Sequence, residues 1–189
     1  PKRVAWIQCV GSRDARTGRS YCSAVCCMFA AKEAMLAQEH CPGLETTIFH
    51  MDRRAHGKQF DAYCDRAVGR YDVRYVRSQI SRIDEVPGSR NLKLRFLSDD
   101  DTIVSEEFDL VVLSTGIRPS PKSMALAERL DVALDPSGFA ATSRFAPVRT
   151  SRPGVYVCGA FEGPKDISET VAQASSAASF ASGALAASR

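Results

Sequence analysis

Two neighbouring segments decide the fold: Cys9-Val10-Gly11-Ser12-Arg13-Asp14 and Tyr21-Cys22-Ser23-Ala24-Val25-Cys26-Cys27-Met28-Phe29-Ala30. Together they hold four of the chain's seven cysteines. Val4–Gln8 precede them and are apolar and β-branched enough for a buried strand. The residues from Cys22 to about Gln38 are rich in Ala and contain no Gly or Pro, which predicts a helix. One cysteine therefore follows a strand, and three lie on the first turns of a helix.

The four cysteines are suited to a soft metal site. On a helix Cys22 and Cys26 are i, i+4 neighbours on one face. Cys27 points about 100° away from Cys26, so it reaches a shared centre only from the first turns of the helix. Unpaired N–H groups at a helix start stabilise thiolates. Four convergent thiolates suit an iron–sulfur cluster or zinc, and buried or redox-paired thiols are the plain structural alternative.

The same residues resemble a known family. Ile7–Asp14 followed by Tyr21–Met28 is similar to the A subunit of heterodisulfide reductase, an iron–sulfur flavoprotein. The resemblance implies one [4Fe-4S] cluster on four ligands, which are Cys9, Cys22, Cys26 and Cys27. Zinc fits less well, because zinc fingers usually use two separated cysteine pairs rather than adjacent cysteines.

Composition excludes several other classes of function. The 189 residues carry a net charge of +3 that is spread along the chain, so no stripe for nucleic acid is visible. No apolar run reaches the roughly 18 residues of a membrane-spanning helix. No secretory signal is visible, and seven cysteines without one favour reduced thiols and a cytoplasmic protein. The chain begins directly before a strand, which suggests a piece of a longer polypeptide.

A β-α-β unit is expected at the start of the chain. Cys41-Pro42-Gly43 ends the predicted helix, and Thr46–Asp52 reads as a second buried strand. Such a unit implies a parallel sheet with a right-handed crossover. No G-x-G-x-x-G sequence follows the first strand, so the cysteine turn occupies the place where a nicotinamide dinucleotide would lie. Asp52, Arg53 and Arg54 are then plain polar residues at a strand exit rather than ribose and phosphate ligands.

The middle of the chain predicts a helix and an antiparallel layer. Residues 58–69 have helical spacing of apolar side chains, and 73–76 form a short strand. Segments 79–86 and 92–97 alternate between apolar and polar residues, and a further strand starts at 102. Turn residues separate these segments, so we expect a β-meander with one solvated face.

The last third resembles part of a flavin domain. Asp109–Pro119 reads as a buried strand and is similar to the strand by which pyridine nucleotide–disulfide oxidoreductases return to their flavin domain. Thr150–Ala160 resembles the last flavin-domain strand of that superfamily, with Ala160 where an Asp usually holds the ribityl chain. Ser168 is the expected N-cap of a helix that runs to about Ala186.

The resemblance also implies residues near FAD: Thr115, Gly116, Gly159, Lys165, Asp166, Ile167 and Thr170. Lys165 is the tentative catalytic residue, because a cation near the isoalloxazine edge stabilises reduced flavin; the alternative is a solvated loop lysine. Cys41 and Cys64 are interpreted as ordinary thiols, and Cys158 as a small buried residue on a core strand.

The predicted fold is α/β: a Rossmann-like nucleotide-binding domain of the pyridine nucleotide–disulfide oxidoreductase type, with an antiparallel β-layer and part of the FAD domain. Residues 1–106 would carry the cluster, and 107–189 would belong to the FAD domain. The expected function is an oxidoreductase component that passes electrons between FAD and the cluster, inactive as this piece alone.

The expected partners are other subunits of a heterodisulfide-reductase-type complex and an electron-donor protein. A homodimer is compatible with the sequence, whereas nucleic acid and direct membrane insertion are not expected. Two alternatives remain open at this point. One is a component of a membrane-associated quinone-interacting oxidoreductase, and the other is a zinc-binding structural module without redox activity.

Overall fold

A computed structural model describes residues 1–187 and divides the chain into two compact units. The first unit contains Pro1–Ser12 and Ala24–Gly116. The second contains Arg13–Ser23 and the chain from Ile117 onward. Each unit has its own core.

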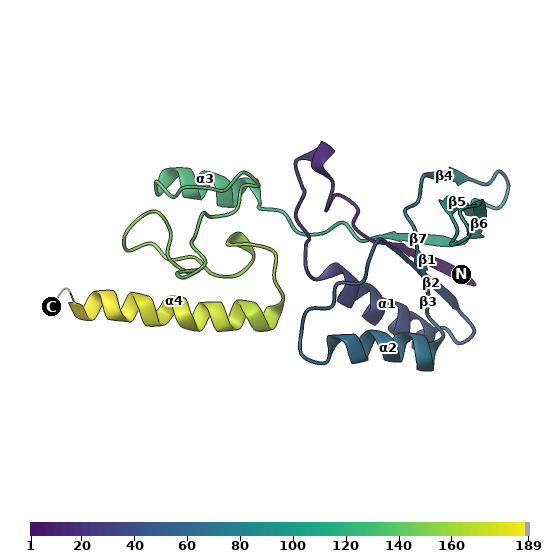
Figure 1. Cartoon of the computed structure of the whole chain (residues 1–189), viewed down its shortest axis with the longest axis horizontal. Helices are drawn as coiled ribbons and strands as arrows, with labels where there is room; N and C mark the ends of the chain where they lie inside the picture. Colours follow the sequence, from purple (N-terminus) through teal and green to yellow (C-terminus); the bar gives the residue numbers. More distant parts are fainter. Residues whose placement is uncertain (188–189) are drawn as a thin grey trace. The chain divides into compact units, whose positions relative to one another are not determined.

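A four-stranded parallel sheet forms the centre of the first unit (Figure 1). Its strands are β1 (Arg3–Ile7), β2 (Glu45–His50), β3 (Arg74–Arg77) and β7 (Leu110–Leu113), in the order β3-β2-β1-β7. All three pairings are parallel, which confirms the predicted β-α-β arrangement.

Two helices cover one face of this sheet (Figure 1). They are α1 (Cys26–His40) and α2 (Phe60–Tyr71). The buried face of α1 consists mainly of Ala30, Ala31 and Ala34, which are fully buried against a core that contains Trp6 and Ile48. Small side chains let the helix backbone approach the strands closely.

A three-stranded antiparallel sheet packs on the other face. Its strands β4 (Arg82–Glu85), β5 (Leu92–Leu97) and β6 (Ile103–Phe108) lie in that order, as the meander predicted. Phe49 of β2 meets Phe96 and Phe108 edge to face, with ring centroids 4.8 and 5.9 Å away. Successive residues of a strand point to opposite faces, so Ile48 faces the helices while Phe49 faces this second core.

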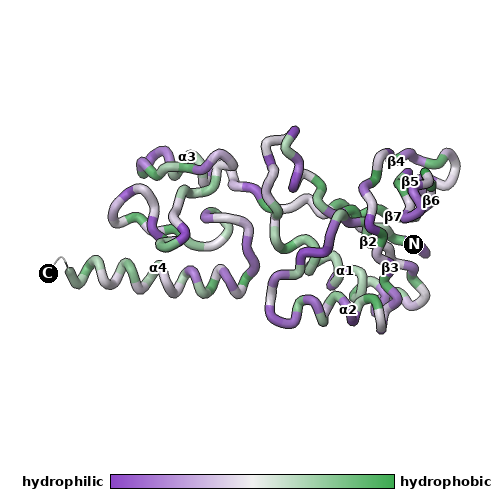
Figure 2. Tube along the Cα trace, in the orientation of Figure 1, coloured by the Kyte–Doolittle hydropathy of each residue, from purple (hydrophilic) through white to green (hydrophobic). Residues whose placement is uncertain are grey.

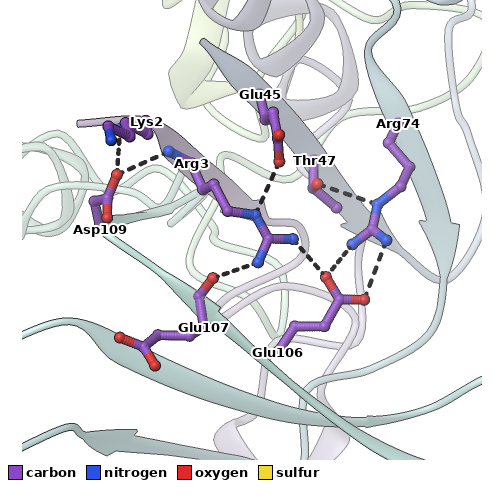
Figure 3. A network of polar contacts seen from close by, with 8 residues as sticks. All are labelled: Lys2, Arg3, Glu45, Thr47, Arg74, Glu106, Glu107 and Asp109. Carbon is purple, nitrogen blue, oxygen red and sulfur yellow. Dashed lines mark hydrogen bonds and ion pairs between the residues drawn. The ribbon is translucent and has the colours of Figure 1, made fainter.

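Charged side chains join the two sheets at the amino ends of the parallel strands (Figure 3). Arg3 donates to Glu106 at 2.9 Å and to Glu45 at 3.0 Å, and Arg74 donates to Glu106 at 2.7 Å. Arg3, Glu45 and Arg74 line part of a pocket of about 580 Å³. These charged groups therefore pair with one another. They lie at the amino ends of the parallel strands, whereas the cysteine segment follows the carboxyl end of β1.

The second unit contains little regular structure. It holds the 3₁₀ turn η1 (Ala15–Thr17), α3 (Pro121–Arg129), the 3₁₀ turn η2 (Gly159–Phe161) and α4 (Ile167–Ala187). A small core forms around Ala127, Val132, Ala140 and Val157. In Figure 2 the tube of α4 is mainly green and white beyond its first turns, yet the described part of α4 has no buried residue.

The helix predicted from Cys22 is shorter than expected, and this expectation is wrong at its start. α1 begins at Cys26, so Cys22 is not its i, i+4 neighbour on a helix. Ala24 has a φ of 63°, which a right-handed helix cannot contain. The hydroxyl of Ser23 accepts a hydrogen bond from the N–H of Ile117 at 2.9 Å, and both residues belong to the second unit.

Three other expectations also need correction. The strand expected within 150–160 is reduced to a single bridge between Arg149 and Tyr156, because only isolated backbone bonds form there. β7 is an edge strand and is not fully buried, since Leu110 and Leu113 are about half exposed at 48% and 50%. α4 begins at Ile167, so Ser168 lies inside the helix and does not cap it.

Within residues 1–187, no helix has the length and apolar character that crossing a membrane requires.

Candidate functional site

The four cysteines lie on both sides of a loop between β1 and α1. Cys9 lies just beyond β1, separated from it by Gln8, and has a φ of 61°. Cys26 and Cys27 are the first two residues of α1. These three belong to the first unit, whereas Cys22 belongs to the segment of the second unit. In a parallel α/β sheet the carboxyl end of a strand and the start of the following helix form the usual cofactor edge.

The surroundings of Cys27 are compatible with a role as a metal ligand. Its Sγ accepts a hydrogen bond from the backbone N–H of Arg54 at 3.4 Å. Hydrogen bonds of this kind stabilise a thiolate and tune a metal bound to it. Within residues 1–187 no group of three or more His, Cys, Asp or Glu is gathered closely enough to hold a metal ion. The four-cysteine ligand set therefore stays a prediction that rests on donor chemistry and on the place of these residues in the fold.

The three other cysteines differ from this set. Cys64 is fully buried on α2, and burial raises the pKa of its thiol, which the charge of Arg53 only partly offsets. Cys41 is exposed just after α1. Cys158 is exposed as well, so its interpretation as a buried core residue is wrong. Its neighbour Val157 is the residue that points into the small core.

The polar residues that follow β2 form ion pairs. The Arg54 side chain contacts the Asp52 carboxylate at 3.2 Å. Arg53 contacts Asp65 of α2 at 2.9 Å. Both arginines thus form ion pairs within the first unit, and their interpretation as plain polar residues at a strand exit stays a prediction.

Four of the residues expected near FAD gather where η2 meets α4. Gly159 has a φ of 71°, and a Cβ atom there would approach Thr170 Cγ2 to 3.1 Å, so this contact requires glycine. The hydroxyl of Thr170 donates to the carbonyl of Asp166 at 2.7 Å. Asp166 and Glu169 exchange side-chain to backbone hydrogen bonds at 2.7 and 2.9 Å, which makes Asp166 the residue that caps α4.

Lys165 is not a solvated loop residue. Its ammonium forms an ion pair with Glu162, and the two side chains are only 9% and 19% exposed. Burial pushes the pKa of Glu162 upward, but hydrogen bonds from Lys165, Gln173 and Thr142 outweigh it and leave the pKa below its ordinary value. Lys165 is therefore a fixed, largely desolvated cation with a partner of opposite charge.

Glu162 and Gln173 are missing from the residues that the sequence predicted for this corner. Gln173 donates to Glu162 at 2.9 Å and accepts a hydrogen bond from the N–H of Gly159 at 2.8 Å. It thereby links the ion pair to the glycine turn. Helical spacing does not signal the pair, because Glu162 and Lys165 lie in the segment between η2 and α4.

The remaining residues expected near FAD are Thr115, Gly116 and Ile167. Thr115 and Gly116 end the first unit, after β7, and Gly116 has a φ of 69°. Ile167 at the start of α4 is 83% exposed. The role of each of these residues toward FAD stays a prediction.

Comparisons with known proteins agree with this architecture. A family model described as pyridine nucleotide-disulphide oxidoreductase matches residues 14–178. Thioredoxin reductase of Lactococcus lactis superposes with a TM-score of 0.62 at 17% identity, over 95% of this chain and 51% of that chain. At this identity the likeness shows the fold alone, and the expected fold class is confirmed.

Sequence relatives carry the more specific similarity. The chain is 45% identical over 188 residues to the iron-sulfur A subunit of CoB–CoM heterodisulfide reductase from Methanocaldococcus jannaschii, over 96% of this chain and 28% of that protein. It is 43% identical over 185 residues to the A subunit of H(2)/formate:CoB-CoM heterodisulfide,ferredoxin reductase from Methanococcus maripaludis, over 95% of this chain and 28% of that protein. The expected similarity to the heterodisulfide reductase A subunit is confirmed, and the chain spans 28% of the length of these relatives. With a family model matched over residues 14–178, the chain belongs to the pyridine nucleotide-disulphide oxidoreductase family.

Proposed function

We propose that the chain is part of an electron-transfer subunit of a heterodisulfide-reductase-like complex and carries one [4Fe-4S] cluster beside an FAD site. The family and the relatives named as heterodisulfide reductase subunits support the flavin-linked oxidoreductase. Cys26 and Cys27 at the start of α1, with the N–H of Arg54 on the Cys27 sulfur, carry the proposal of a cluster.

Cys9, Cys22, Cys26 and Cys27 would hold the cluster, which supplies one-electron transfer when bound. Four thiols of this kind match the soft ligands that iron–sulfur clusters require. The N–H of Arg54 stabilises negative charge on the Cys27 sulfur, and burial of Cys26 keeps water from that side. In this arrangement residues 1–106 form the cluster-bearing domain.

Residues 107–189 would contribute to an FAD site. Gly159 lets the backbone turn closely against α4, and Asp166 and Thr170 fix the start of that helix. Lys165 would place a positive charge at the flavin, and Glu162 and Gln173 would hold its position. A cation of this kind favours reduced flavin, while the paired carboxylate limits the effect.

The proposed partners are the other subunits of such a complex and a protein that donates electrons. The name of the Methanococcus maripaludis relative includes ferredoxin, which makes a ferredoxin-type donor or acceptor the first to test. We also propose a cytoplasmic location.

Cofactor analysis of the full-length protein tests the proposal. After anaerobic purification, flavin, iron, sulfide and zinc are measured per chain. The protein is then reduced stepwise while flavin absorbance and the electron paramagnetic resonance (EPR) signal are followed. We expect the protein to contain FAD, iron and sulfide and no zinc. We also expect that one electron donor both bleaches the flavin absorbance and produces the EPR signal of a reduced cluster. A colourless protein that contains zinc would contradict the proposal. Bound iron that stays oxidised when the flavin is reduced would contradict it as well.

A further inference from the structure

A pocket of about 580 Å³ lies at the amino ends of the parallel strands of the first unit. Its volume falls in the range of about 300–1,000 Å³ that is usual for small-molecule sites. The end of α1, the end of α2 and the start of β2 contribute to its wall. The cysteine segment follows the carboxyl end of β1, so the proposed cluster does not account for this pocket.

Three carboxylates line the pocket, those of Glu39, Glu45 and Asp72. Glu45 contacts the side chain of Arg3 at 3.0 Å. Glu39 accepts a hydrogen bond from the hydroxyl of Tyr71. Among residues 1–187, neither Glu39 nor Asp72 has an ion-pair partner. Two of the three carboxylates therefore keep a negative charge that no cation of the described residues offsets.

The two guanidinium groups that line the pocket are already paired. Arg3 and Arg74 both form ion pairs with Glu106 (Figure 3). Every guanidinium nitrogen of the two arginines donates a hydrogen bond within the first unit. Negative charge therefore exceeds positive charge at the pocket, which favours a cationic ligand over an anionic one.

Two helix C-termini add to this negative potential. Glu39 lies in the last turn of α1, Tyr71 is the last residue of α2, and Asp72 is the C-cap of α2. A helix carries partial negative charge at its C-terminus. The basic residues of these two last turns, His40 and Arg70, do not line the pocket. The backbone thus favours a cation at the same place as the carboxylates.

The spacing of the carboxylates favours an extended cation. Within residues 1–187 no group of three or more His, Cys, Asp or Glu is gathered closely enough to hold a metal ion. The buried side chain of Leu44 and the ring of Tyr71 offer contacts for methylene groups. The amide nitrogen of Gln38 donates to Thr46 at 2.7 Å, so the Gln38 carbonyl oxygen is the atom that can accept from an ammonium group.

We propose that this pocket binds an aliphatic polyamine. Its ammonium groups would pair with Glu39, Glu45 and Asp72, and its methylene chain would lie against Leu44 and Tyr71. Binding would join the ends of α1 and α2 to the start of β2. The inference concerns the first unit alone and does not rest on the proposed electron transfer.

Calorimetric titration of the full-length protein with spermidine tests the inference, at low ionic strength, where exposed charges are weakly screened. The double variant Glu39→Gln, Asp72→Asn should bind roughly tenfold more weakly or worse. Asn suits the φ of 51° at position 72. Asp99→Asn removes a carboxylate from an exposed turn outside the pocket and should bind as the wild type does. No binding to the wild type, or equal weakening in the double variant and Asp99→Asn, would overturn the inference.

Two measurements on the wild type need no variant. Butylamine, which has one ammonium group, should bind at least tenfold more weakly than spermidine, and Mg²⁺ should displace spermidine only as far as NaCl of the same ionic strength does. Spermidine should slow hydrogen exchange in peptides from 38–47 and 71–74 and leave 159–173 unchanged. Equal affinity for butylamine, specific displacement by Mg²⁺, or unchanged exchange at the pocket would each refute the polyamine site.

Discussion

Replacing Glu162 with Gln removes the carboxylate that neutralises Lys165. The two side chains are 19% and 9% exposed, so most of the ion pair is out of water. Gln173 and Thr142 also donate to Glu162, at 2.9 and 3.1 Å. Glu162→Gln keeps the shape of the side chain but leaves the Lys165 ammonium without its counter-charge, in surroundings that hydrate it poorly.

The size of the effect follows from burial. Removal of one member of a fully buried ion pair costs about 3–5 kcal/mol. Glu162 keeps some access to water, and a Gln oxygen can still accept a hydrogen bond, so we expect about 2 kcal/mol. Lys165→Met should cost less, about 1 kcal/mol, because Gln173 and Thr142 still stabilise the carboxylate. The two substitutions together should cost less than their sum.

Hydrogen exchange measured on peptides from 159–173 reports this local stability. A loss of about 2 kcal/mol corresponds to roughly 30-fold faster exchange of the amides that open with the ion pair. The fluorescence of Trp6, the single tryptophan, reports the first unit and should not change. Unchanged exchange in Glu162→Gln, or a larger effect of Lys165→Met, would refute the view that Glu162 offsets a desolvated cation.

Three other results are expected. This chain alone should bind FAD weakly, because no G-x-G-x-x-G turn is present to receive the pyrophosphate; micromolar affinity in an absorbance titration would contradict this. Phe49→Ala should destabilise the first unit by about 3–5 kcal/mol, because Phe49 is 1% exposed; a shift of the Trp6 urea transition worth under about 1 kcal/mol would refute it. Burial raises the pKa of Glu106, but Arg74 and Arg3 outweigh this and leave it below its ordinary 4.5. The stability that the Glu106 carboxylate contributes is complete above that value and is lost as the pH falls through the lower folded pKa. Glu106→Gln should therefore make the free energy of unfolding depend less steeply on pH in the acid range. An unchanged acid slope would argue against this.

The arrangement of the first unit could be predicted because its signals are local. Apolar runs marked β1 and β2, and Pro42-Gly43 marked the end of the helix between them. Pro87-Gly88 likewise marked the turn between β4 and β5. Such residues restrict the backbone whatever the rest of the chain does.

The start of α1 and the second unit depended on contacts distant in sequence. Nothing in the sequence around Ala24 signals a positive φ, which goes with the hydrogen bond between Ser23 and Ile117. The expected strand near Val157 lacks neighbours with which to form a ladder in the described residues, so it forms only isolated bonds. The partner of Lys165 likewise became clear only from burial and the contact itself.

Cluster loading in single Cys→Ser variants of the full-length protein tests the central claim most directly. Iron, sulfide and the reduced EPR signal are measured after anaerobic purification. Substitution of Cys9, Cys22, Cys26 or Cys27 should each remove or alter one cluster, with a loss of up to about four iron atoms. Cys41→Ser and Cys158→Ser, at exposed positions, are the matched controls and should retain it. Full, unchanged loading in Cys27→Ser together with loss in Cys41→Ser would contradict the proposed site.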